Sequence, residues 1–498
     1  MEKPQAGNSF SGKQAVVIGA SMAGLLSARA LVDHFESVIV IERDALVDAP
    51  EPRKGVPQSR QTHALLEKGV QVIGGFFPGF WEEMVELGAV KMDFAKDFIW
   101  FHHGAWKVRM EGGPITFGQS RPLIEYNIRR RLQRDCPRVR LDCGDVVGLS
   151  HDSARGQVTG VRLRGKDGTE SVLEAQLVVD ASGRGTRGPR WLEELGYGRP
   201  PEEHVKIDIC YATRTVQPPP SARDWKAMMV YGKAPHEKRL GYIFPIEGGN
   251  WSLTLGGYHG DHPGSDEAGF MEFARSVHHP VYFEAMKEAR PVSPIAMYKV
   301  PSDQRYYYER MARFPDGYVA VGDAICSFNP IFGQGMTTAA LGASTLSECL
   351  SSRGLGKGFS REFQKRTVRY NDDAWKLVSS EDFRYPETEG ARPPVLGAIN
   401  WYLGQLLSLA SVDNDVQKLL LQVNHMQAGL TSVFRPRFVL KALMWGLGLR
   451  GNRALVVSQP PADPARAPQP VSPLPERKDW ADGAAPSEPP SSSASGTR

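Results

Sequence analysis

Two short apolar runs flank a helical pattern near the N-terminus of the chain. Residues 15–18 and 38–41 are continuous apolar segments, and residues 25–35 carry apolar positions at helical spacing. Continuous apolar runs separated by a helix are typical of parallel strands that are covered on both faces. The pattern therefore predicts a strand–helix–strand unit of a parallel sheet over residues 13–44.

The pattern changes after residue 200. Strand-like segments at 240–246 and 251–257 are separated by a polar, glycine-containing turn, which is a hairpin signal. An apolar strand returns at 318–321, an apolar helix follows from about Met336, and residues 359–449 are helical in pattern. We predict an α/β fold with a Rossmann-like domain at 13–200 and 301–358, an antiparallel-sheet domain at 201–300 and a helical region at 359–455. The remaining ends, 1–12 and the Pro/Ser-rich 456–498, are predicted to be tails, the second disordered.

Composition excludes some classes of protein. The 498 residues carry a net charge of only +4, and the basic residues are spread along the chain, so no nucleic-acid partner is expected. Five scattered cysteines without a CxxC pair favour a reducing, cytoplasmic setting. Residues 394–412 are uncharged but interrupted by polar residues, which favours a buried or amphipathic helix; a peripheral contact with a membrane surface is the alternative.

A glycine-bearing turn joins the first predicted strand to the helix. It differs from the dinucleotide-binding pattern GxGxxG by having Ser21 where the second glycine stands. That position must be small because the backbone approaches a pyrophosphate there, and a serine hydroxyl can itself bond a phosphate. The helix that follows offers free N–H groups to an anion. We predict that a dinucleotide is bound here by Gly19, Ser21, Met22, Ala23 and Gly24.

Glu42 lies at the end of the second predicted strand, 18 residues beyond Gly24. A carboxylate at this place accepts hydrogen bonds from the ribose hydroxyls of an adenine dinucleotide. It would repel a 2′-phosphate, which disfavours NADP at this turn. Arg43 adjoins it and is assigned to the same site. Arg53, in a loop rich in proline and arginine, is a candidate for reaching the pyrophosphate or the ring of the ligand.

A second glycine-bearing segment follows the strand predicted at 318–321. Asp323 is placed at a strand end, where it can accept hydrogen bonds from polyol hydroxyls. The next run brings bare backbone close to a flat ligand and opens a helix whose positive end would face that ligand. If the ligand is a flavin, this stabilises negative charge on the reduced ring. The candidate contacts are Gly322, Asp323, Pro330, Gly333, Gln334, Gly335 and Met336.

Together the two segments resemble those of the para-hydroxybenzoate hydroxylase-type, or class A, flavin monooxygenases. The resemblance implies that the first segment holds the ADP part of FAD and that Asp323 contacts the ribityl chain. The run 177–184, LVVDASGR, resembles the family's Asp-Gly segment in a form also seen in geranylgeranyl reductases and halogenases, which makes Asp180 a candidate. Arg121 is similar to an arginine that reaches FAD in relatives. The Rossmann-like domain is then an FAD-binding domain, and the antiparallel sheet is the substrate domain.

Further segments, at 55–58, 61–66, 77–79, 244–247 and 435–437, look like the bacterial polyether polyene epoxidases. This resemblance implies that NAD(P)H reduces FAD transiently and that O2 then forms a flavin C4a-hydroperoxide. One oxygen atom would pass to a small lipophilic substrate of secondary metabolism, by epoxidation or hydroxylation. No catalytic side chain is required because the cofactor carries the chemistry. Gln58, His63 and Phe244 are the candidates for the substrate side.

Other functions stay open. A reductase of an isoprenoid or polyene would share the DASGR run, and a non-redox, FAD-containing cyclase would keep both segments. A flavin halogenase is less favoured because the chain has no Trp-x-Trp pair. No metal site is predicted, because the adjacent pairs His102–His103 and His278–His279 are expected to diverge in regular structure. The substrate, the choice of NADH or NADPH and the oligomeric state are not fixed by the sequence.

Overall fold

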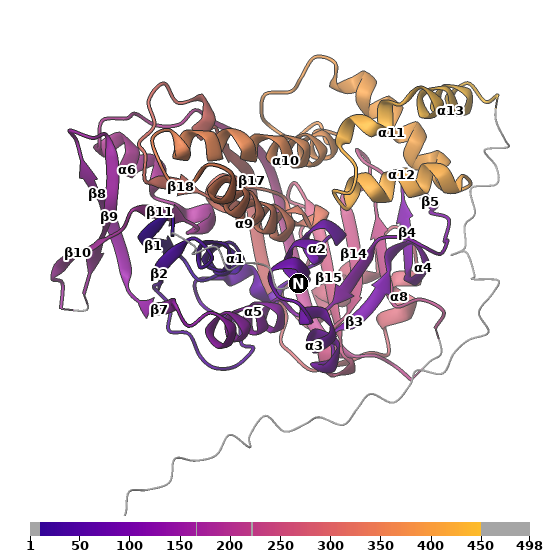
Figure 1. The fold of residues 1–498 in the computed structure, drawn as a ribbon. Helices are drawn as coiled ribbons and strands as arrows, with labels where there is room; N and C mark the ends of the chain where they lie inside the picture. The colour runs from indigo at the N-terminus through magenta and orange to yellow at the C-terminus, as the bar shows by residue number, and fades with distance from the viewer. Residues whose placement is uncertain (1–9, 166, 221–222, 450–498) are drawn as a thin grey trace, which may run out of the picture.

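A five-stranded parallel sheet organises the N-terminal half of the molecule (Figure 1). The computed structural model describes residues 10–165, 167–220 and 223–449, so the predicted tail at 456–498 lies outside the described residues. The predicted strand–helix–strand unit is present as β1 (Gly12–Ile18), α1 (Met22–Leu31) and β2 (Phe35–Glu42). The strand order is β18-β11-β1-β2-β7, completed by β7 (Val139–Cys143), β11 (Leu177–Asp180) and β18 (Tyr318–Ala320).

The alternation of side chains along β1 explains how both faces of this sheet are covered. Ala15 and Val17 pack with α1, α5 (Arg121–Asp135) and α9 (Gln334–Arg353) in one apolar cluster. Val16 and Ile18 belong to the cluster on the other face, which includes residues of β8 (Asp145–Asp152) and β9 (Gln157–Arg164). These two strands form a separate antiparallel sheet with β10 (Glu170–Glu174). Continuous apolar runs are thus buried on both sides, as parallel strands require.

The second large sheet is mainly antiparallel and has the order β19-β17-β12-β15-β14-β13-β4-β5. The predicted hairpin is present as β14 (Arg239–Pro245) and β15 (Trp251–Tyr258). The sheet extends beyond residues 201–300, because β4 (Phe98–His102) joins it in parallel with β13 (Ala227–Tyr231). Its other strands are β5 (Ala105–Trp106), β12 (Glu202–Gln217), β16 (Arg290–Pro291), β17 (Ala296–Tyr306) and β19 (Cys326–Ser327).

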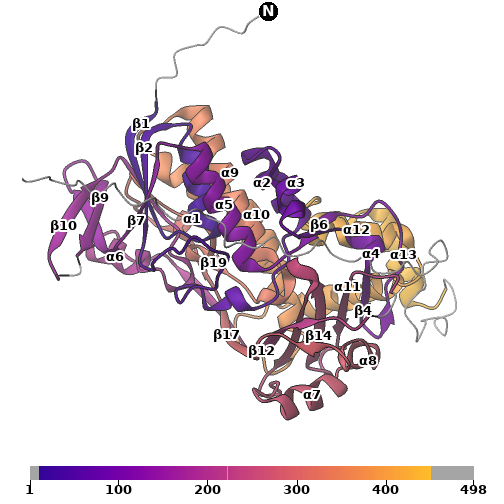
Figure 2. The same cartoon turned by 90° about the horizontal axis from the view of Figure 1, so that it is seen from below.

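Helices cover one face of this sheet, and the other face points toward the centre of the molecule. Met228, Val230 and Ile243 pack against α7 (Glu267–Arg275) and α8 (Val281–Met286), which lie outside the sheet in Figure 2. The alternate residues Tyr242 and Phe244 belong to the large central cluster. The smaller elements are α2 (Glu67–Phe76), α3 (Phe80–Glu86), β3 (Val90–Asp93), α4 (Phe94–Asp97), β6 (Ile115–Gly118) and α6 (Gly188–Glu194).

The C-terminal region is helical, as predicted. It consists of α10 (Phe359–Asp382), α11 (Leu396–Leu409), α12 (Asn414–Asn424) and α13 (Pro436–Gly446). The last three gather beside β4 and β5, at the upper right of Figure 1. Within the described ranges, none of the helices combines the length and the apolarity that crossing a membrane requires.

Candidate cofactor and substrate site

A cavity of about 570 Å³ opens at the carboxyl ends of the parallel strands. Four strand ends meet there: Gly19 follows β1, Glu42 ends β2, Ala181 follows β11, and Asp323 follows β18 by a short turn. In open α/β sheets this edge is where ligands bind. The cavity brings together most of the predicted cofactor residues, which are Gly19, Ser21, Met22, Ala23, Glu42, Arg43, Arg121, Asp323, Pro330, Gly333, Gly335 and Met336.

Glycines in the first turn are required by close packing. A Cβ at Gly24 would lie 1.8 Å from the carbonyl oxygen of Gly19, so this residue allows α1 to approach β1. Gly19 has φ +99°, and a Cβ there would lie 2.7 Å from the carbonyl oxygen of Ala181. Gly24 does not line the cavity, and its role is to seat the helix against the strand.

The Glu42 carboxylate is almost wholly buried at the rim of this turn. Its Oε2 atom accepts a hydrogen bond from the Ala20 backbone N–H at 2.8 Å, and its Oε1 atom accepts one from the Asp44 N–H at 3.1 Å. The Arg53 guanidinium lies 3.3 Å from Glu42 Oε2. Arg53 therefore lies behind the turn, where its guanidinium holds the Glu42 carboxylate. It does not line the large cavity.

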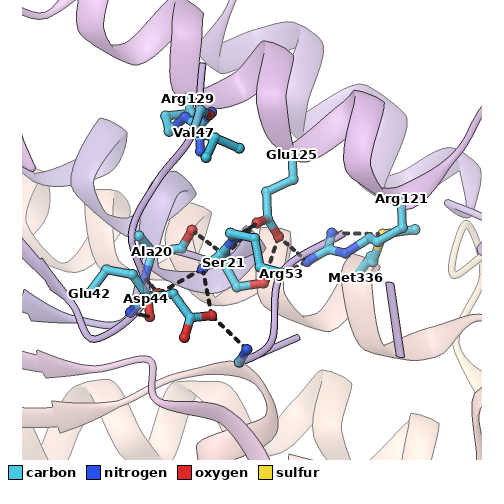
Figure 3. A network of polar contacts seen from close by, with 11 residues as sticks. Ala20, Ser21, Glu42, Asp44, Val47, Arg53, Arg121, Glu125, Arg129 and Met336 are labelled. Carbon is cyan, nitrogen blue, oxygen red and sulfur yellow. Dashed lines mark hydrogen bonds and ion pairs between the residues drawn. The ribbon is translucent and has the colours of Figure 1, made fainter. Parts of the chain in front are cut away.

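Glu125 on α5 joins two buried arginines beside the first turn (Figure 3). It accepts hydrogen bonds from Arg53 Nε at 3.0 Å and from Arg121 Nη2 at 2.8 Å. Burial by itself raises the pKa of the Glu125 carboxyl, but the two guanidiniums lower that pKa overall. Sequence reasoning did not assign Glu125 a role; its signal was the spacing of four residues from Arg121 on one helix face.

The Ser21 hydroxyl belongs to the same network. It donates to Glu125 Oε2 at 2.8 Å and accepts from Arg121 Nη2 at 2.7 Å. Helix α1 begins without a side-chain cap. Its first N–H groups therefore remain as donors for a phosphate, in line with the predicted phosphate site at this turn.

Asp180 lies under the cavity wall and does not line the cavity. Its carboxylate is fully buried and accepts hydrogen bonds from the Ser182 N–H at 3.0 Å, the Thr186 hydroxyl at 2.6 Å and the Tyr318 hydroxyl at 2.9 Å. These bonds fix the loop after β11. The residues of that loop that line the cavity are Ala181, Ser182, Gly183, Arg184, Gly185 and Arg187. The first four belong to the DASGR run, of which only Asp180 was predicted as a contact.

The second glycine-bearing segment supplies the Asp323 carboxylate and a stretch of backbone that side chains do not cover. Burial raises the pKa of Asp323, while Arg184 and Arg121 act in the opposite direction. A Cβ at Gly335 would have nothing nearer than the Asp323 carboxylate at 3.7 Å, and a Cβ at Gly183 would have nothing within 4 Å. These residues leave room along the backbone that a flat ligand can fill, so the cavity fits FAD.

Two other residues of this segment that are predicted cofactor contacts, Gly322 and Gln334, lie behind the cavity wall and fix the backbone of the segment. Gly322 has φ +59°, and a Cβ there would approach that of Ala23 to 3.0 Å. Gln334 is buried and donates its amide to the Asn424 carbonyl at 3.4 Å. Neither residue lines the cavity, so both act on the position of the backbone.

A second cavity, of about 190 Å³, adjoins the first and is mainly apolar. The two share the lining residues Thr62, Ala64, Tyr242, Pro330, Ile331 and Gly333. Of the predicted substrate residues, Phe244 lines the second cavity, whereas Gln58 and His63 line the first. Burial, followed by the charge of Arg121, lowers the pKa of His63 to about 4, so its imidazole is neutral. His63 Nδ1 donates to the Gln61 carbonyl at 2.9 Å, which leaves Nε2 as an acceptor.

One expectation about this region is wrong. The side chains of His102 and His103 converge, with ring centroids 4.8 Å apart. His103 has φ +54° and Gly104 has φ +71°, so the pair sits at the turn between β4 and β5 and does not follow the alternation of a strand. Both histidines line the second cavity together with Glu381 and Arg384.

A buried pair of carboxyl groups lies behind the second segment. Asn329, which lines the first cavity, donates its amide to Asp382 Oδ1 at 2.7 Å. Burial is the main cause that raises the pKa of Asp382 to about 6, and burial together with Asp382 raises the pKa of Asp303 well above its usual range. The two groups can therefore share a proton at neutral pH.

This pair predicts a pH-dependent change in stability. Because folding raises both pKa values, the carboxyls stabilise the fold fully at low pH, and this contribution is lost as the pH rises through the folded values, near 6 for Asp382. Asp303→Asn should therefore gain thermal stability relative to the unmodified protein at pH 8, and less at pH 5. Melting curves at the two pH values measure the difference. An equal shift at both would show that Asp303 does not titrate as proposed.

No protein-family model matches the chain. Protein Rv3254 of Mycobacterium tuberculosis (strain ATCC 25618 / H37Rv) is 34% identical to it over 384 residues, which cover 74% of this chain and 80% of that protein. The chain belongs to the family of protein Rv3254.

Solved structures with the same fold were also found. The flavin-dependent brominase Bmp2 superposes with a TM-score of 0.60 at 14% identity, covering 88% of this chain and 98% of its own. The p-nitrophenol 4-monooxygenase PnpA of Pseudomonas putida DLL-E4 gives 0.58 at 18% identity, covering 84% and 99%. The Diels-Alderase PyrE3 gives 0.56 at 16% identity, covering 83% and 80%. The predicted fold class is confirmed by these similarities, which at such low identity concern the fold alone.

Proposed function

We propose that this chain is an FAD-dependent monooxygenase that transfers one oxygen atom from O2 to a small lipophilic substrate. The observation that supports this function most strongly is the pair of adjoining cavities. One is lined by both glycine-bearing segments, from Glu42 to Asp323, and the other is apolar and enclosed by aromatic side chains. Because the two cavities share a wall, a substrate in the apolar cavity would lie beside one end of the cofactor cavity.

The residues of the first cavity divide between the two ends of FAD. Glu42 would hold the adenosine ribose, and the N–H groups at the start of α1 would hold the pyrophosphate. Asp323 would accept hydrogen bonds from the ribityl chain. The positive end of α9, which begins at Gln334, would face the ring system and stabilise negative charge on it. Bound FAD, once reduced by NAD(P)H, supplies the activation of O2.

The protein's part in the reaction is to orient the substrate and to exclude water. Aromatic side chains, including Phe244, would hold the apolar body of the substrate. Gln58 and neutral His63 would face the substrate side of the ring, where His63 Nε2 can accept a proton or a hydrogen bond. Epoxidation of an alkene and hydroxylation of an arene are both within this proposal.

Two rival functions leave different traces. The similarity to a brominase keeps halogenation in view, but no lysine lines either cavity in the part of the chain that the structure describes. By resemblance, flavin halogenases carry a catalytic lysine, and these lining residues contain no counterpart to it. The similarity to a Diels-Alderase favours the non-redox alternative, in which FAD shapes the cavity and NAD(P)H is not consumed.

Isotope labelling tests the proposed function. The purified chain, loaded with FAD, would be given NAD(P)H, ¹⁸O2 and a panel of apolar alkenes and phenols. We expect products that carry one ¹⁸O atom and NAD(P)H oxidation that accelerates with substrate. Cyclised product without NAD(P)H consumption would support the non-redox alternative, and reduced product without ¹⁸O would support a reductase.

We also propose that the C-terminal helices contact a lipid surface. Eight of the thirteen exposed large apolar residues among the described residues lie between positions 395 and 449. Leu440, Leu443 and Leu447 have the spacing of one helix face, and exposed Arg435 and Arg437 at the start of α13 would suit anionic headgroups. These helices also carry lining residues of the apolar cavity, so a lipophilic substrate could enter from the membrane.

Vesicle sedimentation tests this contact. The unmodified chain should pellet with vesicles of phosphatidylcholine and phosphatidylglycerol, and the double variant Leu440→Glu with Leu443→Glu should lose most of this binding. Val172→Glu, at a residue 58% exposed on β10, is the matched control and should bind like the unmodified chain. Equal loss in both variants, or no sedimentation of the unmodified chain, would count against a membrane surface.

A further inference from the structure

Polar side chains gather on one part of the wall of the apolar cavity. Trp100, His102 and His103 come from β4 and its turn, and Glu381 and Arg384 come from the end of α10. None of them belongs to the wall shared with the cofactor cavity. The remaining lining is mostly aromatic or aliphatic, so this cluster is the main polar feature available to a ligand there.

Two buried polar atoms of the cluster lack a hydrogen-bond partner among the described residues. They are Trp100 Nε1 and His102 Nδ1. The two residues are separated by one position on β4 and therefore point to the same face of the sheet, where their rings stack with centroids 5.7 Å apart. Buried polar groups without a partner are rare and costly, so this pair needs an explanation. A ligand with a hydrogen-bonding group would supply the missing partner.

The cationic side chains that line the cavity are neutralised by carboxylates. Arg384 donates from Nε and Nη2 to the two oxygens of Glu381, at 2.7 and 2.9 Å. Arg239 makes the same kind of pair with Asp261, at 2.9 to 3.0 Å from Nε and 2.6 Å from Nη2. Among the lining residues that the structure describes, these are the two arginines, and lysine is absent. The lining side chains therefore offer no uncompensated positive charge. Lys107, which donates to the His102 carbonyl from behind the wall, has its pKa lowered to about 7 by burial.

The two histidines do not add a positive charge to the cavity either. Burial is the main cause that lowers the pKa of His103 to about 4 and that of His102 well below its usual range. Each neutral imidazole offers one donor and one acceptor. That set suits a hydroxyl group, which both donates and accepts, and it does not suit a carboxylate, which would enter without a counter-charge.

A metal ion is the other candidate ligand for this cluster of side chains. Ligand atoms of His102, His103 and Glu381 lie within 4.8 Å of one another. However, both Glu381 oxygens already accept hydrogen bonds from Arg384, so a cation there would lie next to a guanidinium. This charge arrangement favours a neutral ligand over a metal.

We propose that Trp100, His102 and His103 form a subsite that binds the hydroxyl group of an apolar alcohol or phenol, and that the Glu381–Arg384 pair keeps this subsite from accepting carboxylates. The identification of this ligand as the substrate rests on the proposed function. The subsite itself is a statement about binding, and it is tested without turnover.

Calorimetric titration of the full chain with 4-butylphenol and 4-butylbenzoate provides the test. The phenol should bind at least about tenfold more tightly, because its hydroxyl is paired and the benzoate charge is not. Glu381→Gln leaves Arg384 without its counter-charge, so benzoate affinity should rise about tenfold while phenol affinity changes little. Glu387→Gln, which removes an exposed partner of Lys238 outside the cavity, is the control and should change neither affinity.

Other results would overturn the subsite. Equal affinity of the unmodified chain for the two probes would do so, as would a Glu381→Gln variant that folds normally by circular dichroism yet keeps rejecting benzoate. Tight binding of ZnCl2 that this variant abolishes would replace the subsite with a metal site. If Glu381→Gln does not fold, His102→Phe serves instead, and it should weaken the phenol about tenfold and leave benzoate unchanged. Phenol binding without oxygenation would contradict the proposed function but would still support the subsite.

Discussion

Gly24→Ala is expected to destabilise the protein by about 3 kcal/mol or more, at the upper end of what overpacking costs, and to abolish FAD binding. The added methyl would lie 1.8 Å from the carbonyl oxygen of Gly19. The methyl is fixed on helix α1 and the carbonyl belongs to the backbone that follows β1, so the clash cannot be relieved by a side-chain rotation. Helix α1 must move away from β1, and the N–H groups at its start leave the phosphate position.

Gly75→Ala is the matched control for this substitution. Gly75 is also in a helix, α2, and a Cβ there would meet nothing within 4 Å. Alanine is the better helix former, so this variant should be as stable as the unmodified protein or up to about 1 kcal/mol more stable. Urea unfolding and FAD titration of both variants measure the difference. A Gly24→Ala protein that unfolds with the same midpoint as the unmodified chain would show that the turn is not packed as described.

Glu125→Leu is expected to cost about 3–5 kcal/mol, because it leaves two buried guanidiniums without their shared carboxylate. Arg53 keeps Glu42 and Asp44 nearby, whereas Arg121 loses its ion-pair partner (Figure 3). Removal of a buried partner costs more than the pair contributes, since the remaining charge stays desolvated. FAD affinity should also fall, because Arg121 and Ser21 are held in place by Glu125.

Glu170→Gln provides the comparison for the second prediction. Glu170 also pairs with arginines, but its side chain is 45% exposed on β10, where an ion pair contributes only about 0–1 kcal/mol. Denaturant midpoints of the two variants should therefore differ strongly. If Glu125→Leu loses no more stability than Glu170→Gln, the buried network does not support the first turn.

The sequence predicts the parallel sheet well because its signals are local. The apolar runs of β1 and β2, the intervening glycine turn and the carboxylate at Glu42 all lie within one short segment. The same holds for the hairpin of β14 and β15. The joining of β4 to β13 is not predictable in this way, since it depends on pairing between distant residues.

The candidate site shows the same difference between local signals, which the sequence reveals, and contacts between distant residues, which it does not. The two glycine-bearing segments were found from their spacing, and the structure brings them to one cavity. Glu125 was missed because a carboxylate on an amphipathic helix is ordinarily a surface residue, and its burial depends on the distant Arg53. Adjacent side chains such as those of His102 and His103 diverge in regular structure, but the positive φ of His103 places both rings on one cavity wall. Phe244 proved to line a different cavity from Gln58 and His63.

The dissociation constant of FAD, measured on the unmodified chain and on the single variants Glu42→Ala and Asp323→Ala, tests the central claim most directly. That claim is that two segments far apart in the chain grip opposite ends of one dinucleotide. We expect equimolar, tight binding by the unmodified chain and a loss of about tenfold or more in each variant, since each removes hydrogen bonds to a different part of the ligand. An unmodified chain that stays colourless in excess FAD, or variants that both bind FAD unchanged, would contradict it.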